Sequence, residues 1–401
     1  MSEHLQQDSL LTRRNWLVLA ASAVSGCGGG SASTTAGLPG TGGTGVVYSQ
    51  GSISGFGSVI VNGIKFDDLQ ATVQMDGGPA KSNDLRIGMV ASVQGKRSAD
   101  PTLGTASHIE VWSIAQGPVL QVPTVTQSTQ RADGTVAEFA EFSVAGMIVQ
   151  TNPDTSFYGV ALASDLVPNQ VVTVWGLQAG ADGTRWTATY VVVRPMGMDM
   201  VSTGVVHVAG LQRSLNGLLL TGTTAGTLND GSLVRVQGAW SDTSNSLAVA
   251  HAKLLGSGLV VQLPGDDEIE VEIEGFVTDI PTASRFMLGN IVVDASAISP
   301  LNAQIKKGTR VEVYGTWQSG VLRAAKVKIE DQQALEQVEI EARIEQFTSR
   351  ADFVVRGQRC DATGATISPS TEAALKVDVK VKLKGSKAGD VLLVTELEID
   401  D

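Results

Sequence analysis

The tripeptide Val93-Gln94-Gly95 decides how this chain folds, because its pattern returns four times further along the sequence. Each copy has an aliphatic residue, a variable residue and a glycine, and successive copies are 62 to 81 residues apart. The copies are Val174-Trp175-Gly176, Val236-Gln237-Gly238, Val313-Tyr314-Gly315 and Leu383-Lys384-Gly385. Self-similarity of this kind indicates one structural unit repeated along the chain.

Each copy lies inside the same local pattern of short strands. Upstream is a strand that ends in glycine, as in residues 142–146. Downstream is a closing strand with apolar residues at alternate positions, as in residues 106–111, and an opening strand such as 51–55 precedes the set. The pattern predicts five modules, the third of them shortened. They are residues 47–114, 115–200, 201–258, 259–336 and 337–401.

Module length selects the fold class. Each module has room for about five short strands in roughly 60–80 residues. An immunoglobulin-type sandwich usually needs about 100 residues, whereas a five-stranded barrel of the oligonucleotide/oligosaccharide-binding (OB) type fits this length. We therefore predict an all-β chain, a tandem array of about five small OB-like barrels, with a sandwich or irregular β-module as the alternative. In modules 1, 4 and 5 the polar turn before strand four is expected to hold the single helix that such barrels often contain. These turns lie at residues 83–86, 300–307 and 370–375.

Alternating charges in module 5 make the barrel testable. Lys380, Lys382 and Lys384 share one face of strand four, because successive residues of a strand point to opposite sides. Acidic rows mark strands one and five: Glu339, Glu341 and Glu345, then Glu396, Glu398 and Asp400. In a closed OB barrel, strand four lies between these two strands. Lys382 is therefore expected within reach of Glu341 or Glu345 on one side and Glu396 or Glu398 on the other.

Module 4 reverses this arrangement. Acidic residues line strand one, and Lys326 and Lys328 lie on strand five; the acidic row is Glu268, Glu270, Glu272 and Glu274. We expect both charge stripes to be solvated barrel exterior with neighbouring counter-charges. A docking surface for a charged partner is the alternative.

Composition excludes several classes of protein. The 401 residues carry a formal charge of −12, with 29 Lys and Arg against 41 Asp and Glu. Binding a nucleic-acid backbone needs concentrated cationic side chains, so no nucleic acid is expected as a partner. Four His and two Cys are too few for a large metal site or a disulfide framework.

Residues 1–27 have the order of an export signal rather than of a folded element. Arg13-Arg14 is followed by the apolar stretch 16–24 and by small residues that end at Cys27. Val24-Ser25-Gly26-Cys27 resembles the bacterial lipobox, which implies that the Cys27 thiol carries a diacylglyceryl group and becomes the mature N-terminus. An ordinary cleaved signal peptide is the alternative. The two arginines leave both the general and the twin-arginine export routes open.

Residues 28–46 are rich in Gly, Ser and Thr and predict a flexible linker. Gly28, rather than Asp, follows Cys27. By resemblance to enterobacterial sorting rules, this favours the outer membrane. The expected location is the cell envelope, with the protein attached to the membrane by its N-terminal lipid and facing the periplasm.

Residues that could carry chemistry are few and scattered. Cys360 falls where Phe66, Val149 and Val293 fall in other modules, so we expect a buried, structural thiol. The mature histidines, His108, His207 and His251, lack the spacing of a zinc site. The sequence has neither a nucleophile elbow nor a phosphate-binding loop that runs into a helix. We therefore assign no catalytic residue and no cofactor.

Met196, Met198 and Met200 form the one unusual cluster, within five residues at the junction of modules 2 and 3. Thioethers are soft ligands that bind Cu(I). Flexible methionine side chains also fill irregular contacts. We expect the packing role, and copper binding is the alternative.

The first module also resembles a known family. GSISGFGSVIVNGIKFD (residues 51–67), DLRIGMVASVQG (84–95) and ASHI (106–109) are similar to the bacterial Domain of Unknown Function 5666 family. The other four modules match progressively more loosely. The resemblance implies tandem β-domains in exported, often lipid-anchored, proteins, and it supplies no activity and no catalytic residue.

Together these observations favour a non-enzymatic, membrane-anchored envelope lipoprotein whose modules bind or scaffold a partner. That partner is expected to be another envelope protein or a polysaccharide. The alternative is a periplasmic protein that binds copper or a small ligand at the methionine segment.

Overall fold

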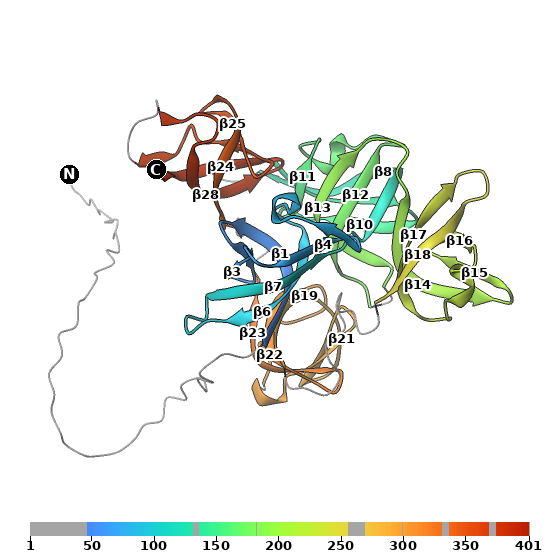
Figure 1. Cartoon of the computed structure of the whole chain (residues 1–401). Helices are drawn as coiled ribbons and strands as arrows, with labels where there is room; N and C mark the ends of the chain where they lie inside the picture. The colour runs from blue at the N-terminus through green and yellow to red at the C-terminus, as the bar shows by residue number, and fades with distance from the viewer. Residues whose placement is uncertain are drawn as a thin grey trace, which may run out of the picture. The chain divides into compact units, whose positions relative to one another are not determined.

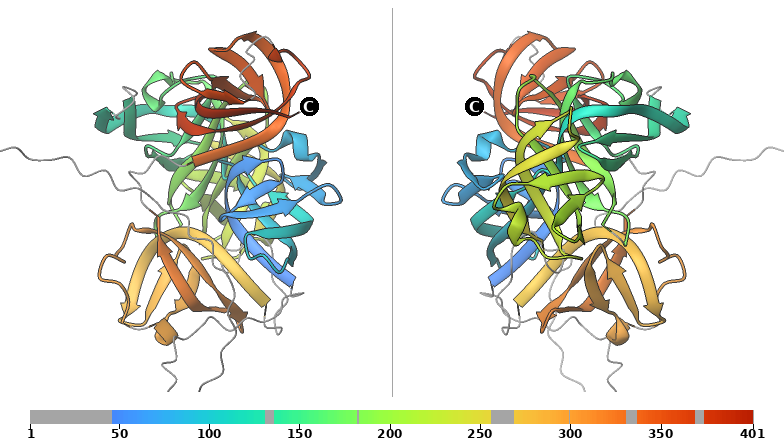
Figure 2. Two further views of the ribbon diagram at one scale, coloured as in Figure 1. Left: turned by 90° about the vertical axis from the view of Figure 1, so that its left-hand side faces the viewer. Right: turned by 90° about the vertical axis from the view of Figure 1, so that its right-hand side faces the viewer.

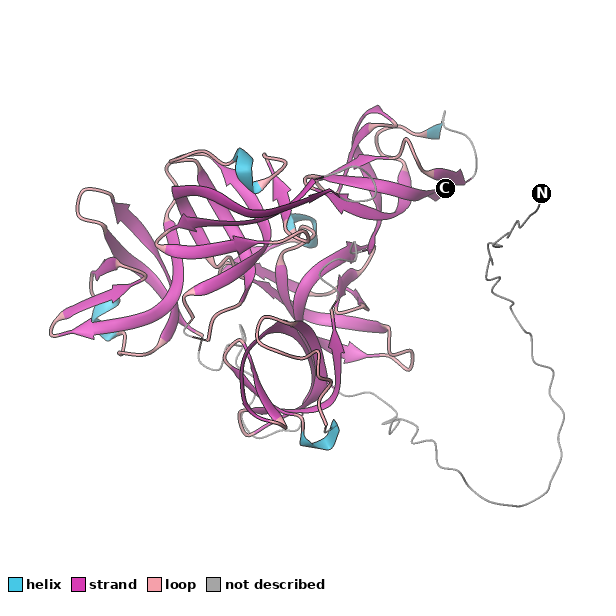
Figure 3. Ribbon diagram, turned by 180° about the vertical axis from the view of Figure 1, so that it is seen from behind, coloured by secondary structure: helices cyan, strands magenta, loops and turns pink. Residues whose placement is uncertain are grey.

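The computed structural model describes residues 46–130, 136–181, 183–255, 269–298, 300–330, 337–368 and 374–400. In these ranges the chain is all-β, and its helical elements are short 3₁₀ turns (Figure 1; Figure 3). None of these turns has the length or the apolar character needed to cross a bilayer. The predicted signal peptide 1–27 with Cys27, and all but the last residue of the linker, lie outside the described residues.

The strands fall into five consecutive sets, which we call modules 1 to 5 (Figure 1). Module 1 contains β1 (Val46–Phe56), β2 (Val59–Val61), β3 (Ile64–Asp67), β4 (Thr72–Met75), β5 (Gly78–Ala80), β6 (Val90–Arg97) and β7 (Leu103–Val111). Module 2 contains β8 (Ala115–Gln130), β9 (Val136–Val144), β10 (Met147–Thr151), β11 (Ser156–Tyr158), β12 (Val171–Gln178) and β13 (Arg185–Arg194).

The remaining strands repeat the same plan. Module 3 contains β14 (Met200–Ala209), β15 (Gln212–Leu215), β16 (Leu218–Thr221), β17 (Leu233–Ser241) and β18 (Ser246–Leu254). Module 4 contains β19 (Ile269–Thr282), β20 (Arg285–Leu288), β21 (Ile291–Asp294), β22 (Arg310–Gln318) and β23 (Val321–Ile329). Module 5 contains β24 (Gln337–Ser349), β25 (Asp352–Val355), β26 (Gln358–Asp361), β27 (Thr366–Ser368), β28 (Lys380–Ala388) and β29 (Val391–Asp400).

Each module closes into a barrel. In module 4, β19 pairs with β20, β20 with β21, and β22 with both β23 and β19, all antiparallel. The parallel pair β21–β23 closes the ring, which Figure 2 shows in orange and Figure 3 shows end-on. The same closing parallel pair recurs as β3–β7, β10–β13, β16–β18 and β26–β29. The prediction of small five-stranded barrels is confirmed, and the sandwich alternative is wrong.

The repeated glycine of the fourth strand lies opposite a bulge in the fifth strand of every module, where one residue of the fifth strand has no partner. The register against the fifth strand shifts at Gly95, Gly176, Gly238, Gly315 and Gly385. A Cβ atom at any of these positions would fall on a carbonyl oxygen of the facing strand. A bulge increases the local twist of a strand, which helps a short sheet to curve into a barrel. Glycine recurs there because no side chain fits.

The helix expected before strand four is shorter than predicted. Module 1 has the 3₁₀ turn η1 (Ser82–Asp84), and module 4 has η4 (Ser296–Ile298), which precedes the predicted stretch 300–307. In module 5, residues 370–373 of the predicted turn lie outside the described part of the chain. Turns of this length carry too few backbone hydrogen bonds to sustain an α-helix.

The lysine row of module 5 confirms the predicted strand order. β28 pairs with β24 on one side and β29 on the other, with Glu341 and Glu398 opposite Lys382. The Lys382 Nζ lies 3.2 Å from an oxygen of Glu339, one pair further along the strand than predicted. Lys380 pairs with Glu341 at 2.6 Å and Lys384 with Glu396 at 3.0 Å.

The acidic row of module 4 is not solvated, and that expectation is wrong. Glu272 and Glu274 are only 8% and 6% exposed, because β1 of module 1 pairs in parallel with β19 from Val47↔Glu270 to Gln50↔Ile273. The row is a docking surface, and its partner is another module of the same chain. Glu268 lies outside the described residues.

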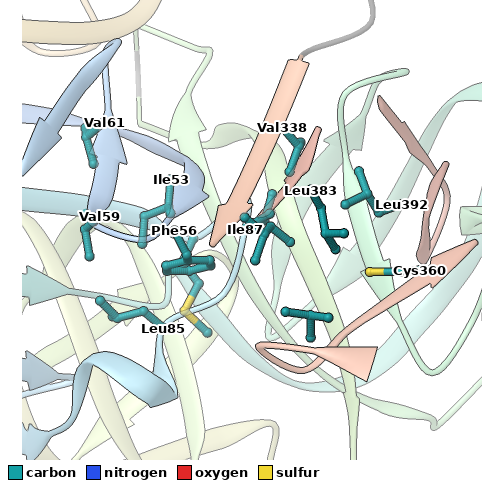
Figure 4. Close-up of a cluster of buried hydrophobic side chains, with 14 of the residues drawn as sticks. Ile53, Phe56, Val59, Val61, Leu85, Ile87, Val338, Cys360, Leu383 and Leu392 are labelled. Atoms are coloured by element: carbon teal, nitrogen blue, oxygen red, sulfur yellow. The ribbon is translucent and has the colours of Figure 1, made fainter. Parts of the chain in front are cut away.

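Module 1 also joins module 5. β1 pairs in parallel with β24 through Gly55↔Glu339 and Phe56↔Ile340. One cluster of buried side chains runs through both modules, and Figure 4 shows Ile53 and Phe56 of module 1 in the same cluster as Leu383 and Leu392 of module 5. Modules far apart in sequence are therefore fastened by both backbone pairing and a common core.

Candidate functional site

The methionine segment does not bring three thioethers together. Met200 is 1% exposed and packs in the core of module 3, whereas Met196 and Met198 are 83% and 49% exposed. Because Met200 is buried in this core, its sulfur atom does not reach the surface where the other two methionines could meet a copper ion. Over the described ranges, no group of three or more His, Cys, Asp or Glu side chains is placed to hold a metal ion.

Cys360 occupies the inward position predicted for it. It is 1% exposed, faces Phe353 and Leu392 on the neighbouring strands, and lies among aliphatic side chains (Figure 4). Burial raises the pKa of its thiol to about 12. Because the thiolate is the nucleophile, this cysteine is a packing residue. His108, His207 and His251 lie on the separate strands β7, β14 and β18.

A polar cluster that joins three modules centres on Arg310 of β22. Its guanidinium pairs with Glu274 of module 4 and, at 3.0 Å, with Asp154 of module 2. Ser52 of module 1 completes the cluster, since its amide and hydroxyl donate to Glu274 at 2.8 and 2.9 Å. Every member already has partners inside the cluster. We therefore interpret it as a set of contacts that holds three modules together, rather than as a reactive centre.

A pair of carboxyl groups, Glu272 and Glu312, lies beside the Arg310 cluster. Glu272 binds Arg97 of module 1 at 2.5 Å, and Arg97 lies over the Tyr314 ring, 5.3 Å from its centroid. Burial, followed by the hydrogen bond with Glu272 and the charge of that residue, raises the pKa of Glu312 to about 8. Lys328 opposes this shift from 3.5 Å. Two close carboxyl groups share a proton more readily than they both ionise.

A second set of contacts between modules surrounds Trp112, the residue that follows β7. Arg235 of module 3 lies 4.9 Å from the ring centroid of Trp112, and Lys253 lies 3.9 Å from it. Arg235 also binds Asp76 at 2.7 Å, and Lys253 binds Glu110 at 3.1 Å. Burial lowers the pKa of Arg235, and Asp76 opposes that shift. Cation–π contacts are strongest when they are desolvated, as here.

An open groove with a volume of about 410 Å³ lies between modules 1 and 5, and we call it the β1–β24 groove. Its lining is Phe56, Gly57, Ser58, Asp68, Leu69, Lys81, Ser82, Asn83, Glu341 and Arg356. Arg356 lies over the Phe56 ring, 4.3 Å from its centroid, and donates to the Ser82 carbonyl at 2.6 Å. The two cationic and two acidic side chains balance. The groove therefore suits a neutral or mixed-charge partner, and 410 Å³ lies within the range of known ligand sites.

Interior space is small by comparison. A cavity of about 70 Å³ is lined largely by apolar side chains such as Leu177, Leu233 and Ile273. That volume holds a few water molecules. In the described part of the chain, the larger recesses are thus open grooves on the surface.

Sequence reasoning did not find the residues that fasten the modules or line the grooves. One signal was present: Arg235 and Arg310 are long cations in fourth strands that are otherwise rich in Val. A cation inside such a strand indicates a carboxylate facing it from another element. The sequence does not say from which module that carboxylate comes.

Comparison with known families agrees with the repeated architecture. A model described as Domain of unknown function (DUF5666) matches residues 44–110, 124–192 and 274–328. These stretches contain most of the strands of modules 1, 2 and 4. No curated protein matches the chain. The three matches fall on three closed barrels, so they confirm the resemblance to the DUF5666 family and the repetition of one β-domain along the chain.

Proposed function

We propose that this protein is a non-enzymatic envelope lipoprotein whose joined barrels form a platform that binds or scaffolds another envelope component. The observation that carries the proposal is the β1–β24 groove, which is open and balanced in charge. An enzyme needs a nucleophile or an acid–base pair aimed at a substrate site. In the described part of the chain, the buried polar clusters around Arg310 and Arg235 instead make contacts between modules.

The N-terminal sequence supports a membrane tether. The lipobox-like Val24-Ser25-Gly26-Cys27 precedes a Gly/Ser/Thr-rich linker that ends where module 1 begins. A segment of this composition would hold the modules near the membrane and let them turn toward a partner. In this proposal, lipidated Cys27 anchors the protein in the outer membrane and the modules face the periplasm.

The test combines localisation with capture. Wild-type protein labelled with palmitate is expected to float with outer membranes, and Cys27→Ser to remain unlabelled and leave the membrane fraction. Equal membrane association of the two proteins would overturn the tether. Crosslinking in intact cells is then expected to join the wild-type protein to a specific envelope protein or polysaccharide.

A matched pair of variants assigns the captured partner to the groove. Leu69 lines the groove and is 85% exposed, while Leu211 is 97% exposed in a turn of module 3. Leu69→Asp is expected to reduce crosslinking, and Leu211→Asp to leave it unchanged. Equal capture by both variants would exclude the groove as the binding surface.

A further inference from the structure

Module 2 differs from the other modules in the long antiparallel ladder between its first two strands. In the other four modules the first two strands are joined by a connection of two residues, at 57–58, 210–211, 283–284 and 350–351. In module 2 the ladder of β8 and β9 continues from Val119↔Val144 out to Gln130↔Val136. We call this extension, residues 119–130 with 136–144, the arm. OB barrels bind oligosaccharides or oligonucleotides on the face of strands two and three, beside this connection.

A groove of about 280 Å³ lies on that face of module 2. We call it the β9–β10 groove; Thr126 and Phe139 of the arm, Glu141, Gln150 and Phe276 are among its lining residues. Strand alternation explains the outward residues. Phe142, Val144 and Val149 are buried in the barrel, so Phe139, Glu141 and Gln150 point to the other side.

The side chains in this groove match a hydroxyl-rich ligand. Gln150 donates to Glu141 at 3.1 Å, which places an amide and a carboxylate side by side. Such a pair accepts and donates hydrogen bonds to neighbouring hydroxyl groups. Phe139 is half-buried, so part of its ring offers an apolar surface beside the polar pair. Sites for small polar ligands combine apolar surface with a few placed polar groups in this way.

The charges favour a neutral ligand over an anionic one. Arg185 is the cation nearest the pair, and its Nη1 lies 3.6 Å from the same Glu141 oxygen. Glu138 lies on β9, as Glu141 does, and accepts hydrogen bonds from Ser164. Binding a phosphate backbone needs several cations along a groove, together with aromatic stacking surfaces. The lining of the β9–β10 groove has one half-exposed ring, Phe139, and a carboxylate, Glu141.

We propose that the β9–β10 groove binds a neutral oligosaccharide, with a sugar ring against Phe139 and its hydroxyl groups hydrogen-bonded to Glu141 and Gln150. The inference rests on the proposed function in so far as a polysaccharide is one of its two partner classes. It adds a second site, for neutral oligosaccharides, in a different groove from β1–β24.

Calorimetric titration of the purified full chain in detergent tests the proposal. The probes are neutral hexasaccharides of β-1,4-linked glucose, β-1,4-linked N-acetylglucosamine and α-1,4-linked glucose. An oligogalacturonate and a single-stranded oligothymidine are the anionic comparisons. At least one neutral probe is expected to saturate a site with a Kd of about 1 mM or tighter. Phe139→Ala and Gln150→Ala are each expected to weaken that binding about tenfold or more.

Matched controls separate binding from folding. Phe347 of module 5 is also half-buried, and Phe347→Ala is expected to bind the neutral probe as the wild type does. Gln150→Ala removes a half-buried surface amide, so its thermal unfolding should match that of the wild type. The proposal is overturned if no neutral probe saturates, if an anionic probe binds more tightly, or if both groove variants bind unchanged. Sugar binding by the purified chain does not depend on the tether, so its failure and a failure of membrane capture are distinguishable.

Discussion

A Cβ atom at Gly95 of β6 would fall on the Thr105 carbonyl oxygen of β7, beside the bulge in β7. We expect Gly95→Ala to lower the free energy of unfolding by about 1–3 kcal/mol, because the added methyl group clashes with backbone atoms of β7, which must shift to accept it. Denaturation in urea measures this. Gly226→Ala is the control, since a Cβ there meets no atom within 4 Å, and a change within about 0.5 kcal/mol is expected. Equal effects of the two changes would contradict the account of the bulge.

Glu312 makes stability depend on pH at the same scale. Its pKa is raised to about 8 in the folded protein from an ordinary value of 4.5, so the native state binds more protons than the unfolded state between those values. Stability should therefore fall as the pH rises from about 4.5 through about 8. We expect Glu312→Gln to flatten this slope and to melt at a higher temperature than the wild type at pH 9. Melting curves across the pH range measure this.

The control for Glu312 is an acidic residue outside the buried pair. Glu396 has a side chain that is 65% exposed and pairs with Lys384. Glu396→Gln is expected to keep the wild-type slope between pH 4.5 and 8. If Glu312→Gln keeps that slope as well, the proton is not held by this pair.

At the scale of the elements, the lysine row of strand β28 is prominent in the sequence but is expected to contribute little to the free energy of unfolding. Lys382 faces two acidic rows but has a side chain that is 35% exposed, and exposed ion pairs contribute about 0–1 kcal/mol. We expect Lys382→Ala to change the free energy of unfolding by less than about 1 kcal/mol. Urea denaturation with and without added salt measures this. A larger loss would mean that the lysine is packed rather than solvated.

Within a module, the order of strands could be predicted from sequence, because its signals are local. The glycine of the repeated V-x-G marks the position opposite the bulge of strand five, and the lysine row of β28 favours acidic neighbours on both sides. Both signals come from residues inside one module. The short 3₁₀ turns were less predictable, since a polar stretch of a few residues is compatible with either a turn or a short helix.

Contacts between modules could not be predicted in this way. Glu272 and Glu274 alternate along β19 as solvated residues do, yet Arg97 and Ser52 of module 1 cover them. The pairing β1–β19 joins residues more than 200 positions apart, and no local pattern specifies which strand edge meets which. The same gap applies to the β9–β10 groove, because Phe276 comes from a different module than Phe139.

At the scale of the whole molecule, these contacts predict how the described modules unfold. Strand pairing joins module 1 to modules 4 and 5, and Arg310 joins module 4 to Asp154 of module 2. Independent barrels on a string would melt separately, whereas modules that share strands and buried ion pairs melt together. We therefore expect one main calorimetric transition for the wild-type protein.

Arg310 tests that coupling because it is a cation at the meeting point of three modules. Arg310→Ala leaves Glu274 and Asp154 buried without their cation, and loss of one partner of such a cluster typically costs about 3–5 kcal/mol. The single transition should then move to lower temperature and divide, since the barrels themselves keep their strands. Lys307→Ala is the control: this lysine binds Asp279 at 2.6 Å, but its side chain is 68% exposed, so the wild-type profile should persist. If Arg310→Ala unfolds in one transition at the wild-type temperature, the fastening lies elsewhere, in the β1–β19 and β1–β24 ladders alone.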